Sequence, residues 1–182
     1  MGVNQRYSHV VVIFHWLCVA LLVILFFLGQ YMVSLEDGST KWQWYDLHKS
    51  LGFLFVILLL ARIFWRSTHH YPKFSSHSAV LESLASITHL MLYLVMIILP
   101  ISGYLDSAAG GYHFGFFGLF DIPAVVEKNA QLASLALSAH VAAGWLLVGL
   151  VVMHASAALF HQFVWRDGTL YRMLPLVFLQ KK

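Results

Sequence analysis

The sequence predicts an all-α integral membrane protein, a four-helix bundle that forms a single membrane domain over residues 1–182. The chain is 60% hydrophobic and only 10% charged, with a mean hydropathy of +0.75, whereas soluble proteins carry about 25% charged residues. Its apolar residues also fall into four runs, each close to the ~20 residues that a helix needs to cross a bilayer. We therefore expect one membrane domain and no independent soluble one.

The four predicted spans cover residues 8–33, 45–65, 87–105 and 139–160. The first is rich in Val, Leu, Ile and Phe. The second begins after a Trp and Tyr cluster that is typical of a membrane interface, and it ends at Arg62 and Arg66. In the third, Pro100 and Gly103 come late enough to kink or end the helix.

The segment between the third and fourth spans contains Gly110, Gly111 and an apolar cluster at residues 114–120. This cluster is too short and too rich in glycine to cross a membrane, so we expect an interfacial loop. Asp121 and Pro123 then predict a helix start. We therefore expect the fourth helix to begin well before the membrane.

The basic residues divide unequally between the two predicted sides of the membrane. One side holds eight, namely Arg6, Arg62, Arg66, Lys73, Arg166, Arg172, Lys181 and Lys182. The other side holds three, Lys41, Lys49 and Lys128, together with six carboxylates. Because Lys and Arg gather on the cytoplasmic side, both termini are predicted to be cytoplasmic. This orientation explains the isoelectric point of 9.1, and we expect no nucleic-acid partner.

Histidines are the chemically distinctive residues of the spans, because a single cysteine, Cys18, provides neither a disulfide framework nor a cysteine-based metal site. His140 and His154 are fourteen residues apart on the fourth span. That separation is nearly four helical turns and a rise of ~21 Å, so both point to roughly one side at opposite depths. In an antiparallel bundle, His15 shares the depth of His154, and His48 shares the depth of His140.

Two histidines that face each other at one level form the ligand pattern of a haem iron with two axial imidazoles. We therefore predict two haem b groups. The inner iron is expected between His15 and His154, and the outer iron between His48 and His140.

Five further residues are predicted to line the haem sites. Gly52 and Gly144 each lie four residues after a ligand of the outer haem, where the missing side chain leaves room for the porphyrin. The inner pair has no such glycine. Lys49 on the outer side, and Arg62 and Arg66 on the inner side, are available to pair with haem propionates. The two arginines serve equally well as positive-inside anchors.

Other assignments of the histidines stay open. His161 lies seven residues after His154 and would replace it if the fourth helix sat deeper. His89 on the third span is a second competitor, for which we favour an interfacial or supporting role. A histidine-lined metal or proton transporter is the alternative function. Such a pathway should also contain carboxylates at mid-span, and none lies clearly within a span.

Several segments resemble a known family. They are residues 6–16 (RYSHVVVIFHW), 47–52 (LHKSLG), 61–66 (ARIFWR), 101–104 (ISGY), 117–123 (FGLFDIP) and 165–173 (WRDGTLYRM), together with His140, His154 and His161. They resemble the bacterial cytochrome b561 family of four-helix, di-haem cytochromes of the inner membrane. The resemblance implies the same axial pairing, a multi-pass protein of the bacterial inner membrane, and electron transfer linked to the quinone pool.

The resemblance favours electron transfer between quinone and a partner at the periplasmic face, with ubiquinone as a further ligand. One branch of the family oxidises superoxide and passes the electron to ubiquinone. Here the predicted outer surface is acidic and would repel an anion, and the 47–50 and 117–121 segments resemble another branch more closely. Superoxide oxidase (superoxide:ubiquinone oxidoreductase) is therefore the alternative. A membrane anchor subunit for a soluble dehydrogenase or cytochrome is a third hypothesis.

Overall fold

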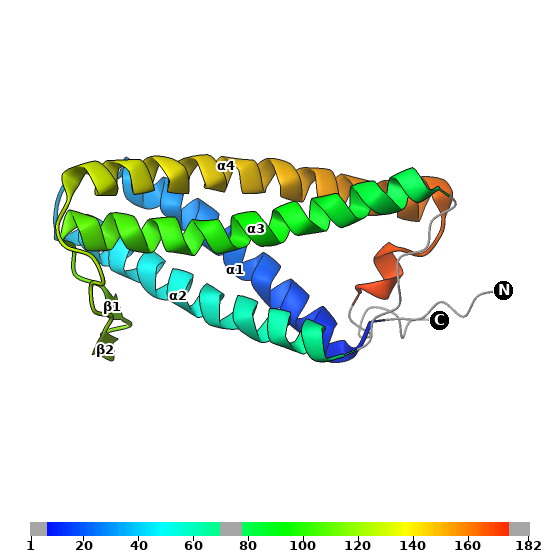
Figure 1. Ribbon diagram of the computed structural model, residues 1–182, viewed down its shortest axis with the longest axis horizontal. Helices are drawn as coiled ribbons and strands as arrows, with labels where there is room; N and C mark the ends of the chain where they lie inside the picture. Colours follow the sequence, from blue (N-terminus) through cyan, green and yellow to red (C-terminus); the bar gives the residue numbers. More distant parts are fainter. Residues whose placement is uncertain (1–6, 70–77, 175–182) are drawn as a thin grey trace.

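A computed structural model describes residues 7–69 and 78–174 of the chain. Four long helices make up most of it: α1 (His9–Ser34), α2 (Ser39–Thr68), α3 (Ala79–Gly110) and α4 (Ala130–Phe160). All four are long and apolar enough to cross a membrane, and they run side by side along one axis (Figure 1). The predicted all-α membrane four-helix bundle is confirmed.

Three of the helices extend beyond the predicted spans. Helix α3 continues past Pro100 to Gly110 and is capped by Gly111, whose φ of 74° is the left-handed conformation that favours glycine. The predicted helix start at Asp121 and Pro123 is wrong. Helix α4 begins at Ala130 instead, where the side chain of Asn129 accepts a hydrogen bond of 3.0 Å from the Leu132 backbone N–H.

A small hairpin between α3 and α4 was not predicted. Strands β1 (Gly115–Phe116) and β2 (Phe120–Asp121) pair antiparallel. The buried hydroxyl of Ser50 on α2 holds the hairpin, since Ser50 Oγ donates to the Gly115 carbonyl at 3.1 Å and accepts from the Phe117 N–H at 3.0 Å. The loop predicted over residues 114–120 is thus an ordered element that rests against α2.

The helices pack as two pairs, α1 with α2 and α3 with α4, and α2 makes a smaller contact with α3. Buried side chains from all four helices form one core: Cys18, Leu21, Phe55, Leu59, Leu92, Val95, Met96, Ala143 and Leu147. On α4, Ala143 and Leu147 lie between His140 and His154. The apolar core therefore separates the two histidine levels.

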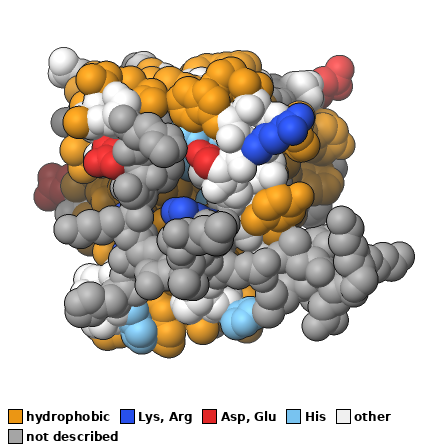
Figure 2. All heavy atoms as spheres, turned by 90° about the vertical axis from the view of Figure 1, so that its right-hand side faces the viewer, with side chains coloured by type: hydrophobic (Ala, Val, Ile, Leu, Met, Phe, Trp, Pro, Cys, Tyr) orange, Lys and Arg blue, Asp and Glu red, His pale blue; other side chains and the backbone are white. Residues whose placement is uncertain are grey.

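The beginning of α1 and the segment after α4 lie at the same end of the bundle (Figure 1). Trp16 Nε1 joins them by donating a hydrogen bond of 2.7 Å to the Met173 carbonyl. Figure 2 looks onto this end, where charged side chains of both signs gather among hydrophobic ones. The side of the membrane that this end faces stays a prediction. Four of the basic residues used for that prediction lie outside the described residues, namely Arg6, Lys73, Lys181 and Lys182.

Candidate functional site

At one level of the bundle, His48 of α2 and His140 of α4 face each other. Their ring centroids are 6.2 Å apart and the ring planes are nearly perpendicular, at 81°. Two imidazole nitrogens that bind one metal ion at about 2 Å each place the ring centres about 6 Å apart. The structure thus brings together the two histidines predicted for the outer haem, at a spacing that fits one metal ion between them.

Helix α3 fixes the orientation of the His140 ring. The Nδ1 atom of His140 lies 2.8 Å from the backbone carbonyl oxygen of Leu99 on α3. Because a carbonyl only accepts hydrogen bonds, His140 Nδ1 carries the proton. The lone pair then lies on Nε2, as in most metal-binding histidines. A Cβ atom at Gly103 would lie 3.0 Å from the His140 ring. Gly103 therefore provides the space for this ring, a role that sequence reasoning missed.

Two other histidine nitrogens are buried without a hydrogen-bond partner in the described part of the chain, Nδ1 of His15 and Nδ1 of His48. Buried polar atoms are rarely left unpaired because desolvation is costly. His48 also packs against Gly29, where an added Cβ would lie 3.4 Å from its Cε1 atom. Both rings are thus held in the interior with one nitrogen unpaired, which distinguishes them from histidines that are fully hydrogen-bonded within the core.

The glycines predicted to make room for the porphyrin border open space. A Cβ atom added at Gly52 or Gly144 would meet nothing within 4 Å, although both residues are partly buried. This space suits a large planar group beside the outer histidines, and the role of these glycines stays a prediction.

At the other level, the structure places a third histidine beside the predicted pair. His89 of α3 lies next to His154, with ring centroids 5.2 Å apart and an interplanar angle of 68°. His15 interacts electrostatically with both and with Arg62, but its ring packs on Trp16 at 5.5 Å. Among the described residues, no ring contact joins His15 to His154. His89 therefore competes with His15 more strongly than the sequence indicated.

Arg62 brings a positive charge to this inner level. It is partly buried, and its guanidinium carbon lies 5.6 Å from the ring centroid of Tyr93. The guanidinium carbon of Arg66, one turn further along α2, lies 5.5 Å from the same ring centroid, and its guanidinium donates to the Tyr93 hydroxyl at 3.3 Å. No carboxylate forms an ion pair with Arg62 within the described ranges. A partly buried cation in these surroundings is suited to an anionic partner.

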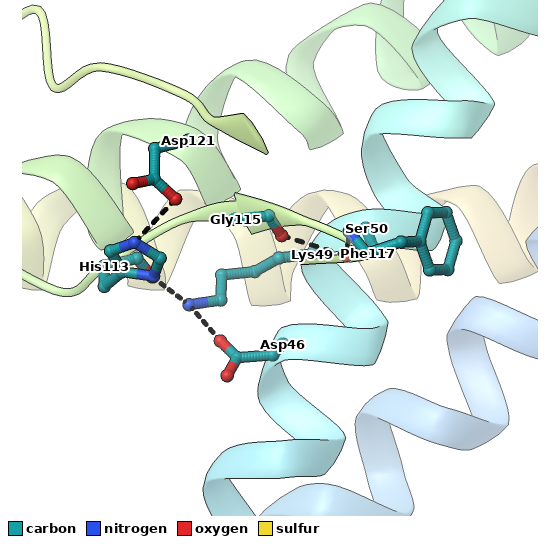
Figure 3. A network of polar contacts seen from close by, with 7 residues as sticks. All are labelled: Asp46, Lys49, Ser50, His113, Gly115, Phe117 and Asp121. Carbon is teal, nitrogen blue, oxygen red and sulfur yellow. Dashed lines mark hydrogen bonds and ion pairs between the residues drawn. The ribbon is translucent and has the colours of Figure 1, made fainter. Parts of the chain in front are cut away.

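Lys49, by contrast, already has partners at the outer level (Figure 3). Its Nζ atom lies 2.8 Å from Asp46 Oδ1 and also donates to the backbone carbonyl of His113. The His113 ring in turn pairs with Asp121, with 2.8 Å between Nε2 and Oδ1. A propionate contact of Lys49 would have to compete with these interactions.

His161 lies in a π-helical turn, His161–Trp165, that follows α4. Its Nδ1 atom pairs with Asp167 Oδ2. Partial burial acts to raise the pKa of Asp167, but the hydrogen bonds from His161 and Thr169 outweigh it and hold that pKa below its usual value. His161 is thus tied to an ionised carboxylate near the end of the bundle.

Comparisons with known proteins agree with this arrangement. A family model described as prokaryotic cytochrome b561 matches residues 6–176. The chain is 38% identical over 177 residues to cytochrome b561 homolog 2 of Escherichia coli K12, covering 93% of this chain and 92% of that protein. It is 26% identical to cytochrome b561 homolog 1 of the same organism, covering 94% and 98%.

A third relative is the probable superoxide oxidase CybB of Yersinia pestis, 30% identical with 94% of this chain and 97% of the relative covered. Each match takes in nearly the whole of both chains, so the likeness extends over all four helices. The chain therefore belongs to the prokaryotic cytochrome b561 family of b-type haem membrane cytochromes.

Proposed function

We propose that this protein carries electrons through the bacterial inner membrane between the quinone pool and a partner at the periplasmic face, by way of two haem b groups. The observation that carries the proposal is the facing pair of His48 and His140, 6.2 Å apart, with the His140 tautomer fixed by a backbone carbonyl. When bound, haem iron supplies the one-electron chemistry. The protein supplies the axial ligands, the spacing and the electrostatics.

The two sites share helix α4, which contributes His140 to the outer site and His154 to the inner one. Fourteen residues of helix separate these ligands, a rise of ~21 Å along the bundle. The apolar core between them excludes water from the interior. We assign His15 as the partner of His154 on the basis of the family resemblance, and His89 as a supporting neighbour of the same site.

Charged side chains fit the propionates of the inner haem better than those of the outer one. Arg62 lies beside the three inner histidines without a carboxylate partner among the described residues, and Arg66 shares its contact with Tyr93. Charge-assisted bonds between arginine and carboxylate are among the stronger polar interactions in proteins. We therefore assign Arg62, with Arg66 beside it, to an inner propionate. Lys49 is the candidate for an outer one.

Superoxide oxidation is the second candidate function, because a relative with 30% identity is named a probable superoxide oxidase. The charges at the hairpin end of the bundle favour it less. Two of the three lysines there, Lys41 and Lys49, are neutralised by Asp37 and Asp46 at 2.9 and 2.8 Å. The remaining carboxylates leave a surface that repels a small anion.

Replacing His48 or His140 with Ala should remove the outer haem and retain the inner one. The haem-to-protein ratio should fall from about two to about one, because the outer iron loses one of its two axial ligands in either variant. The measurement is the absorbance of the reduced b-type bands per purified protein. His113→Ala, on the hairpin, is the control and should retain both haems. Loss of the inner haem in either variant would contradict the assignment of levels.

The inner ligand can be identified by comparing His15→Ala with His89→Ala. We expect His15→Ala to lose the inner haem and His89→Ala to retain it with a shifted midpoint potential, because His89 then only adjoins the ligand His154. Haem content and redox titration give the two measurements. If His89→Ala lost the haem while His15→Ala kept it, the inner pair would be His89 with His154.

The open space at Gly144 can be tested by filling it. Gly144→Leu should lower the occupancy of the outer haem several-fold, because the new side chain would enter the space assigned to the porphyrin. Gly149→Leu is a matched control on the same helix. A Cβ there also meets nothing within 4 Å, but the residue is exposed on the outside of the bundle. Equal haem content in both variants would show that no cofactor lies against Gly144.

Stopped-flow reduction distinguishes the two electron donors. We expect a short-chain ubiquinol to reduce the haems. Superoxide should reduce them slowly at low ionic strength, and faster with added salt, because salt screens the repulsion between superoxide and the carboxylates. Fast reduction by superoxide at low salt would instead establish superoxide oxidation as the activity, while leaving the di-haem arrangement intact.

A further inference from the structure

The tip of the β1–β2 hairpin consists of apolar side chains that are about half exposed or more, although Phe116 packs against two of them. Phe117, Leu119 and Phe120 are 46%, 76% and 51% exposed. No charged residue lies between Phe114 and Phe120. Such a cluster on an ordered loop differs from the scattered exposed apolar residues of ordinary protein surfaces.

The backbone of the tip is one that bulky residues avoid. Phe117 has a φ of 48° and Gly118 a φ of 71°, and the Leu119 N–H donates to the Phe116 carbonyl at 2.9 Å. A turn with two left-handed central residues usually contains Asn, Asp or Gly at the first of them. Phenylalanine in this conformation is strained by its Cβ contacts. The chain thus accepts a strained residue at the tip without burying its ring within the protein.

The hairpin lies alongside α2 rather than beyond the end of the helices (Figure 1). Aromatic residues of the kind found at membrane–water interfaces mark this level. Tyr112, just before the hairpin, lies 5.5 Å from the Trp42 ring, and Trp42 lies 5.5 Å from Tyr45. In a protein whose helices cross a membrane, the side of the bundle at this level faces the lipid headgroups and upper acyl chains.

Charge is segregated along the hairpin. The ion pairs His113–Asp121 and Lys49–Asp46 lie at its base, whereas the Phe117 ring lies at the opposite end of the network (Figure 3). Ser50 anchors the strands between these two ends. A polar base and an apolar end are the arrangement of segments that lie in a membrane interface.

We propose that the hairpin tip, Phe117–Phe120, is a lipid-binding anchor that inserts into the membrane leaflet at this end of the bundle. The headgroup and upper acyl region would cover the three exposed side chains and offset the strain at Phe117. Because Lys49 and Ser50 directly follow His48, the lipid-held hairpin is also attached to the turn of α2 that carries this histidine. The anchor therefore holds the hairpin in place beside the outer histidine site.

The test is the depth of a fluorescent label at the tip. Leu119→Cys is labelled with bimane and the protein is reconstituted, with its haems, in phosphatidylcholine vesicles at a low protein-to-lipid ratio. The native Cys18 is 1% exposed, and the unsubstituted chain gives its labelling background. Quenching by lipids brominated on the upper acyl chain is compared with quenching by aqueous iodide. Phe120→Cys is a second reporter in case Leu119→Cys fails to fold.

Two reference positions calibrate the result. Leu60 is 59% exposed on the outside of α2, so a label at Leu60→Cys gives the quenching expected in lipid. Glu127 is exposed in the segment before α4, so a label at Glu127→Cys gives the quenching expected in water. We expect the tip label to match Leu60→Cys, with several-fold stronger quenching by brominated lipid than at Glu127→Cys. Quenching by iodide as strong as at Glu127→Cys would overturn the proposal. So would protection from both quenchers, because the tip would then be covered by protein.

Discussion

The structure depends on one geometric constraint, that imidazoles from different helix pairs face each other in an apolar interior. Such a ring must have both nitrogens satisfied or held for a ligand, because lipid and apolar side chains offer no hydrogen bonds. His140 meets this constraint through helix α3, where the Leu99 carbonyl fixes its proton and Gly103 leaves room for its ring. Helix α3 thus positions the ring of His140 without contributing a histidine of its own to this pair.

The two histidine levels of the bundle differ in the residues that surround the imidazole rings. The outer level is an isolated pair of histidines with open space at the nearby glycines. The inner level gathers three histidines and Arg62, which forms no ion pair with a carboxylate among residues 7–69 and 78–174. The core between the levels keeps the sites separate.

The hairpin packs against the part of α2 that carries His48. Its strands are too short to be stable alone, and they persist because Ser50 and Lys49 of α2 bind their backbone. Lys49 and Ser50, which directly follow His48 in the sequence, therefore also hold the hairpin in place. The same few residues join the hairpin, a surface network of charges and the part of α2 that carries His48.

The sequence by itself determined the four helices and the depth of each histidine. Backbone groups in a bilayer must bond within their own helix, so length and apolarity suffice to locate a span, and helical rise converts residue number into depth. Depth predicts that His48 and His140 share a level, and the structure shows that their rings also face each other. Only the tertiary structure decided the neighbour of His154, which is His89, the role of Gly103, and the strands of the hairpin. Each depends on how helices rotate and pack against one another, and side-chain contacts between distant segments set that rotation.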